Sequence, residues 1–151
     1  MKYQFLLILF TVVAIVMNGC GGNVSAAVSP TSTVESQEVE DQASLIAGLQ
    51  AAGATVEVGD SITQDFFSVK GQTVKVNGVD LQVFEYENAD AMEKDASEVA
   101  PDGGSIGASM VMWMDTPHFY KAGRIIALYL GKDQTILGLL NKVIGPQFAG
   151  Q

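Results

Sequence analysis

Hydrophobic residues recur at helical spacing in three stretches of the chain, and each stretch predicts an amphipathic helix with one face in a core. The predicted helices span about Gln42 to Ala52, Asn88 to Val99 and Asp133 to Val143. Asn88 and Asp133 begin two of them, where a short polar side chain can accept hydrogen bonds from free backbone N–H groups. Gly145 and Pro146 follow the last helix and stop it.

Alternating hydrophobic and polar residues predict strands between these helices. The clearest is a hairpin over 72–86, because its central Asn77-Gly78 favours the type I′ turn of a two-residue loop. In that register Lys75 faces Asp80 on the exposed side. The other predicted strands are Val56 to Val58, Ile62 to Val69, Ile106 to Met114 and Arg124 to Leu130.

The predicted order of elements is α-β-β-β-β-α-β-β-α, with about six strands and three helices. The segment 117–123 is predicted as a hairpin-like connection before the last strand. Because consecutive strands are joined by short turns, we expect a mainly antiparallel sheet, one face of which the three helices can cover. The fold class is therefore α+β, and no glycine-rich phosphate loop follows a strand.

The first 20 residues have a different pattern. A short basic start precedes an almost uninterrupted apolar run from Leu6 to Met17. A run of about 12 residues is too short to span a membrane comfortably. This layout predicts a secretory signal peptide over residues 1–19.

The residues Met17, Asn18, Gly19 and Cys20 close this run, and they resemble the lipobox of bacterial lipoproteins. The resemblance implies cleavage between Gly19 and Cys20 and a diacylglyceryl thioether on the cysteine. It also implies a protein held by membrane lipid on the extracytoplasmic face of a cell membrane, inner or outer. The alternative is an ordinary signal peptide with an incidental cysteine.

Residues 20–41 are rich in Gly, Ser, Thr and Ala and show no apolar periodicity. They are predicted to form a flexible tether, which ends in an acidic stretch. Its acidic residues are Glu35, Glu38, Glu40 and Asp41. Residues 42–151 form the predicted single domain, which is long enough to bury a core.

Two segments of this domain resemble a group of small, uncharacterised bacterial lipoproteins. They are P-H-F-Y-K-A-G-R over 117–124 and G-P-Q-F-A-G over 145–150. F-E-Y over 84–86 and P-D-G over 101–103 are similar to the same group. The resemblance supports an anchored extracytoplasmic domain and implies no activity, ligand or catalytic residue.

Charge and composition exclude several classes of function. The chain of 151 residues has 17 acidic and 8 basic side chains, a formal charge of −9. Nucleic-acid binding depends on clustered Lys and Arg, so no nucleic-acid partner is expected. A single cysteine cannot form an internal disulfide, and one histidine without a thiol in the domain cannot build a common structural zinc site. No cofactor is predicted.

Candidate catalytic residues are few. His118 is the only histidine, but no G-x-S-x-G elbow accompanies it, and it is interpreted as a loop residue at the sheet edge. Glu85 and Glu87 alternate at a strand end, where a solvated pair is favoured over a glycosidase pair. We therefore predict no catalytic residue and no enzyme; a hydrolase ranks third among the hypotheses.

Met110, Met112 and Met114 alternate on one side of a predicted strand, with Trp113 between them and His118 four residues on. Alternating methionines on a strand favour core packing. Thioethers and imidazole also suit Cu(I), and the spacing is similar to sites in periplasmic copper chaperones. Handling of Cu(I) or another soft metal is therefore the alternative function.

Several aromatic residues fall in predicted connections or near an end of the chain. They are Phe66, Phe67, Phe119, Tyr120 and Phe148. About half are expected to complete the core, and Phe119, Tyr120 and Phe148 are candidates for a surface that contacts an envelope protein. The leading hypothesis is a lipid-anchored binding or accessory module without catalytic activity.

Overall fold

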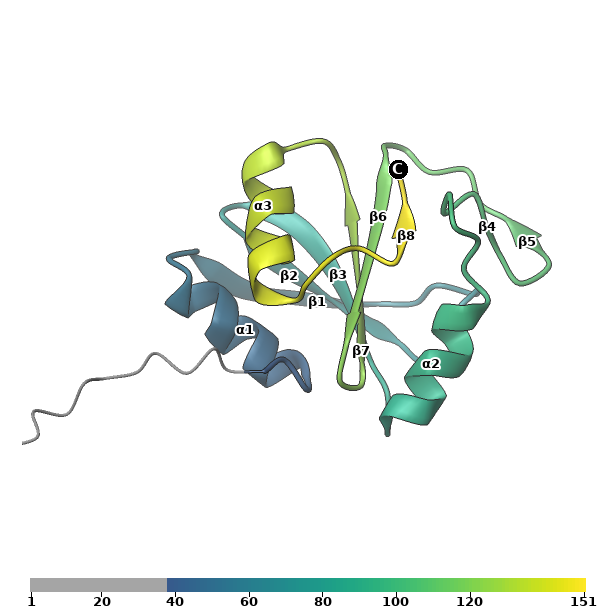
Figure 1. Cartoon of the computed structure of the whole chain (residues 1–151), viewed down its shortest axis with the longest axis horizontal. Helices are drawn as coiled ribbons and strands as arrows, with labels where there is room; N and C mark the ends of the chain where they lie inside the picture. Colours follow the sequence, from purple (N-terminus) through teal and green to yellow (C-terminus); the bar gives the residue numbers. More distant parts are fainter. Residues whose placement is uncertain (1–37) are drawn as a thin grey trace, which may run out of the picture. The chain divides into compact units, whose positions relative to one another are not determined.

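The computed structural model describes residues 38–151 (Figure 1). The predicted signal peptide, its cleavage site and Cys20 lie outside the described residues. The elements are α1 (Gln42–Ala51), β1 (Val56–Ile62), β2 (Gly71–Val76), β3 (Val79–Glu85), α2 (Ala89–Ser97), β4 (Ser105–Ile106), β5 (Ser109–Met110), β6 (Pro117–Ala122), β7 (Ile125–Leu130), α3 (Gln134–Val143) and β8 (Ala149–Gly150). Within 38–151, no helix has the length and apolar character needed to cross a membrane.

Six of the strands form one antiparallel sheet in the order β1-β2-β3-β7-β6-β8, while β4 and β5 form a separate pair. The prediction of an α+β fold with a mainly antiparallel sheet of about six strands and three helices is confirmed. The predicted order of elements is confirmed in outline. It differs in three places: three strands precede α2 where four were expected, four lie between α2 and α3 where two were expected, and β8 follows α3.

Strand β7 is buried on both faces and divides the hydrophobic core into two clusters. Ile126 and Leu128 belong to the cluster that includes α2. Their neighbours Ile125 and Tyr129 belong to the cluster of α1 and α3, which lie side by side (Figure 1). The expectation that all three helices cover one face is wrong, because a strand that is apolar on both sides needs cover on both sides.

The hairpin of β2 and β3 has the predicted turn and register. Asn77 and Gly78 both have positive φ, 52° and 82°, as a type I′ turn requires. Lys75 lies opposite Asp80, and their side chains form an exposed ion pair of 2.7 Å. The hairpin prediction is confirmed.

One predicted strand is absent and another is shorter than expected. No separate strand spans 62–69: Ile62 is the last residue of β1, and the next residues form a turn in which the N–H of Phe67 donates to the carbonyl of Gln64 at 3.2 Å. The strand predicted over 106–114 is reduced to the two-residue strands β4 and β5. Gly107, with a φ of 57°, turns the chain back between them.

The predicted connection over 117–123 is wrong, since most of it is strand β6, between β7 and β8 in the sheet. Pro117 is its first residue, a position where a strand tolerates the missing N–H. The next three residues are buried. His118 is therefore a strand residue inside the sheet and not the loop residue that was expected.

The folded domain begins before residue 42, so the predicted tether is too long at its C-terminal end. Val39 is buried in the core, and the carbonyl of Glu40 accepts from the N–H of Arg124 at 2.8 Å. Asp41 caps α1 by accepting from the N–H of Ser44 at 2.8 Å. That bond, the Ser44 hydroxyl and the Arg124 guanidinium lower the pKa of the Asp41 carboxyl.

Two buried tyrosines differ in their hydrogen bonding. The hydroxyl of Tyr86 donates to Asp95 Oδ2 at 3.0 Å, whereas the buried hydroxyl of Tyr120 has no partner within 38–151. Burial raises the pKa of both phenols. A buried polar group without a partner carries a desolvation cost of about 1–3 kcal/mol.

Substitution of each tyrosine by phenylalanine should therefore change stability in opposite directions. We expect Tyr120→Phe to raise the free energy of unfolding by about 1 kcal/mol and Tyr86→Phe to lower it by about 1.5 kcal/mol. Urea unfolding of the two variants beside the unsubstituted protein measures both. A loss of stability in Tyr120→Phe equal to that in Tyr86→Phe contradicts the assignment of an unpartnered hydroxyl.

Candidate functional site

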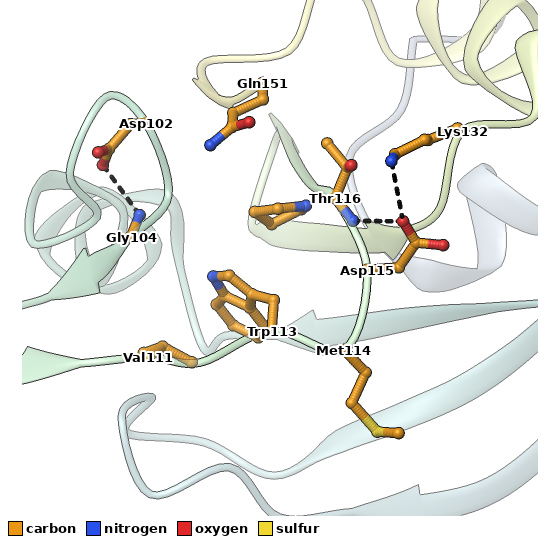
Figure 2. A pocket seen from close by; sticks show the side chains of 10 residues that line it. Asp102, Gly104, Val111, Trp113, Met114, Asp115, Thr116, Lys132 and Gln151 are labelled. Carbon is orange, nitrogen blue, oxygen red and sulfur yellow. Dashed lines mark hydrogen bonds and ion pairs between the residues drawn. The ribbon is translucent and has the colours of Figure 1, made fainter.

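A hollow of about 440 Å³ lies beside the β4–β5 pair (Figure 2). It is formed by the turn before β4, the segment between β5 and β6, the loop between β7 and α3, and the end of the described chain. Its lining residues are Asp102, Gly104, Val111, Trp113, Met114, Asp115, Thr116, Pro117, Lys132 and Gln151. This open hollow places the aromatic ring of Trp113 beside charged side chains, so it offers both an apolar contact and charge to a ligand.

Trp113 is held in a fixed position at the hollow. Its indole N–H donates to the carbonyl of Gly103 at 2.6 Å. Its ring packs edge-to-face against Phe66 and Phe119, with centroid distances of 5.6 and 5.7 Å. Because the hydrogen bond and both ring contacts orient the half-buried indole, the wall of the hollow is preformed.

Charged side chains lie on two sides of Trp113 (Figure 2). Asp115 accepts from the N–H of Thr116 at 2.7 Å and lies 3.9 Å from the Lys132 ammonium. On the other side, Asp102 accepts from the N–H of Gly104 at 2.9 Å. These local bonds orient the two exposed carboxylates on the rim. Because Lys132 is the one basic side chain among the lining residues, the rim has more negative than positive charge.

The three alternating methionines are exposed and do not pack in the core. The exposed fractions of Met110, Met112 and Met114 are 91%, 96% and 100%. The alternation itself is present, but the inward positions belong to Val111 and Trp113. These two residues pack against the core cluster that includes α2. The expectation of core packing is therefore wrong for all three methionines.

His118 does not belong to the hollow or to a site with the methionines. Its Nδ1 lies 2.7 Å from Gln147 Oε1 and its Nε2 lies 3.0 Å from the Gly131 carbonyl. The ring is buried and stacks on Tyr129. Each ring nitrogen faces an oxygen atom of the fold and the ring is buried, so neither nitrogen is open to a metal or a substrate, and the predicted ligand set that included His118 is wrong.

The predicted partner surface is also corrected. Phe119 and Tyr120 are fully buried, on opposite faces of β6, one in each core cluster. Phe148 is half-buried, and Lys121 Nζ lies 5.1 Å from the centre of its ring. These aromatics complete the core because the segment that holds the first two is a strand inside the sheet, not a connection.

The glutamate pair at the end of β3 has a structural role in one of its members. Glu85 forms an ion pair of 2.5 Å with Arg124 and accepts from the N–H of Gln42 at 3.3 Å. It therefore joins β3 to α1 and the β6–β7 turn, while Glu87 is exposed. Within residues 38–151, no group of three or more His, Cys, Asp or Glu side chains is placed to hold a metal ion.

The sequence did not predict that Asp102, Asp115 and Lys132 form the charged rim of the hollow. In the sequence, Asp102 contributes only to the P-D-G segment over 101–103 that resembles small lipoproteins, and Lys132 has no predicted role. The one available signal was the position of Asp115 directly after the Met-Val-Met-Trp-Met run. The rim residues come from three separate segments, so only the tertiary fold brings them together.

Comparison of the chain with protein-family models, with curated proteins and with solved structures gives no significant match. The fold and the hollow therefore define the protein only as a small α+β domain with a preformed, charged surface site.

Proposed function

We propose that the protein is a binding or accessory module without catalytic activity, anchored by lipid on Cys20 to the extracytoplasmic face of a cell membrane. The observation that supports binding is the preformed hollow, in which Trp113 is fixed between two exposed carboxylates. The lipobox-like sequence that ends at Cys20 supports the anchor. The buried His118, whose two ring nitrogens face oxygen atoms of the fold, supports a role other than catalysis.

The chemistry of the hollow favours a polypeptide ligand with basic side chains. Its apolar wall of Val111, Trp113 and Pro117 can contact an aliphatic side chain. The rim carries Asp102 and Asp115 against Lys132, and this net negative charge can attract cations. The excess of acidic residues in the whole chain, 17 against 8, acts in the same direction. An envelope protein with a basic, partly apolar segment therefore fits the site best.

The single tryptophan of the chain makes this proposal measurable, because Trp113 is the wall of the hollow. We expect the peptide Lys-Lys-Leu-Lys-Lys to change the tryptophan fluorescence of the full chain in a saturable way that weakens with salt. The acidic peptide Glu-Glu-Leu-Glu-Glu should leave the emission unchanged. The combined variant Asp102→Asn and Asp115→Asn should bind the basic peptide about fivefold more weakly, at about 0.5 kcal/mol for each exposed ion pair.

The combined variant Glu57→Gln and Asp60→Asn is the matched control, since both are exposed acids on edge strand β1, outside the hollow. It removes two negative charges, as the tested variant does, but should leave the affinity close to that of the unsubstituted protein. An equal loss in this control would assign the effect to overall charge. A fluorescence that neither peptide changes would contradict binding in the hollow.

A further inference from the structure

The sulfur atoms of three methionines are concentrated on one exposed segment. Met110, Met112 and Met114, here called the methionine ladder, are almost completely exposed. The one other exposed large hydrophobic residue within 38–151 is Val58, at 55%. Because these side chains are not buried, they contribute little to the stability of the fold, and their exposure needs another explanation.

The backbone of the ladder is held by its inward neighbours. The N–H of Val111 donates to the carbonyl of Gly104 at 3.0 Å, and the indole N–H of Trp113 donates to Gly103. Met110 is paired with Ser105 in the two-stranded β4–β5 sheet. Exposure alternates along residues 110–114, so the three methionines point outward from a segment that Val111 and Trp113 hold in place.

This spacing brings thioethers within reach of one ion. Alternate residues of an extended chain lie about 6.6 Å apart on the same side. Each methionine side chain has three rotatable bonds, so neighbouring sulfur atoms can turn toward a common point between them. The chain bends at Met114 and Asp115, which turns the third side chain relative to the other two.

The identity of the side chains favours a metal over an apolar partner. A hydrophobic contact surface can use Leu, Ile or Phe equally well, yet all three outward positions carry sulfur. The chain has six methionines, and these five consecutive positions contain three of them. Thioether ligands select soft ions such as Cu(I), whereas Mg²⁺ and Ca²⁺ prefer oxygen ligands.

The charge of the chain and the burial of His118 also bear on which groups can bind a cation here. Asp115 follows the ladder directly, and the acidic chain attracts cations to its surface. His118 contributes no ligand, because its ring is buried and both its nitrogens face oxygen atoms of the fold. We propose that Met110, Met112 and Met114 together form a surface site for one soft monovalent cation of the Cu(I) class, with thioether sulfurs as its protein ligands.

The test uses Ag(I), a soft monovalent ion that does not change oxidation state, and the full lipidated chain with ¹³C-methyl-labelled methionine. We expect one equivalent of Ag(I) to shift the methyl resonances of the three ladder residues together. Met92, which is buried in the α2 cluster, should not shift and serves as an internal control. Ca²⁺ at the same concentration should shift none of them.

The combined variant Met110→Leu, Met112→Leu and Met114→Leu keeps the apolar character of the ladder and removes its sulfur. It should lose the binding of Ag(I), and of Cu(I) in competition with a chromophoric chelator, while its circular dichroism stays unchanged. Retained binding in this variant would overturn the proposal, as would ladder resonances that do not move or that move without saturation. The Trp113 response to the basic peptide is a separate measurement, so a failure of either proposal leaves the other testable.

Discussion

Replacement of Phe119 by alanine should lower the free energy of unfolding by about 3–5 kcal/mol, as expected for a large aromatic side chain deleted from a core. Phe119 is fully buried in β6, where its ring packs against Trp113 and Phe148 at centroid distances of 5.7 and 6.1 Å. The substitution leaves a cavity under the wall of the hollow. Chemical unfolding followed by Trp113 fluorescence and by circular dichroism measures the loss.

The matched control is Phe148→Ala, because Phe148 contacts the same ring but is only half-buried. Its loss of stability should be clearly smaller than that of Phe119→Ala. If Phe119→Ala costs less than about 1 kcal/mol, β6 does not lie inside the sheet and its aromatic residues are free for the surface role expected from the sequence.

The Phe119 prediction depends on a feature that local sequence patterns did not reveal. The β2–β3 hairpin could be predicted because its turn chemistry at Asn77-Gly78 is local. The position of β6 between β7 and β8 depends on pairing with two strands, one of which is only two residues long at the end of the described chain. Neither the proline at its start nor its aromatic residues encode that pairing.

The methionine ladder shows a different limit of sequence patterns. Alternation identifies two sides of an extended segment, but it does not say which side faces the core. The sequence favours burial of the three methionines, whereas Val111 and Trp113 occupy the inward side. The tertiary contacts of Trp113 with Gly103, Phe66 and Phe119 decide which side of the segment faces the core.

The candidate site could be predicted only in part for the same reason. Trp113 and Met114 belong to the run that the sequence analysis singled out, but Lys132 and Gln151 reach the hollow from distant segments. His118, the most obvious chemical candidate in the sequence, is held by Gln147 and Gly131 inside the fold. A residue type alone does not report whether its polar atoms are already bonded.

The Cys20→Ala substitution should have the largest effect in the cell. A diacylglyceryl group supplies two acyl chains, each buried CH₂ contributes about 0.8 kcal/mol, and two lipid signals are needed for stable anchoring. We therefore expect the unsubstituted protein in the membrane fraction after high-salt washing, and the variant, which lacks the acceptor thiol, to carry no acyl chain and to be released or mislocalised. Ser25→Ala, in the same N-terminal segment, is the control and should stay with the membrane.

The intact mass of the protein extracted from membranes tests the central claim, a lipid-anchored extracytoplasmic module, most directly. We predict a chain that begins at Cys20 and carries the added mass of a diacylglyceryl group, with or without a further acyl chain. After proteolysis, the added mass should be confined to the peptide that contains Cys20. A mass equal to that of an unmodified chain, whether it begins at Met1 or after a cleavage, would contradict the claim.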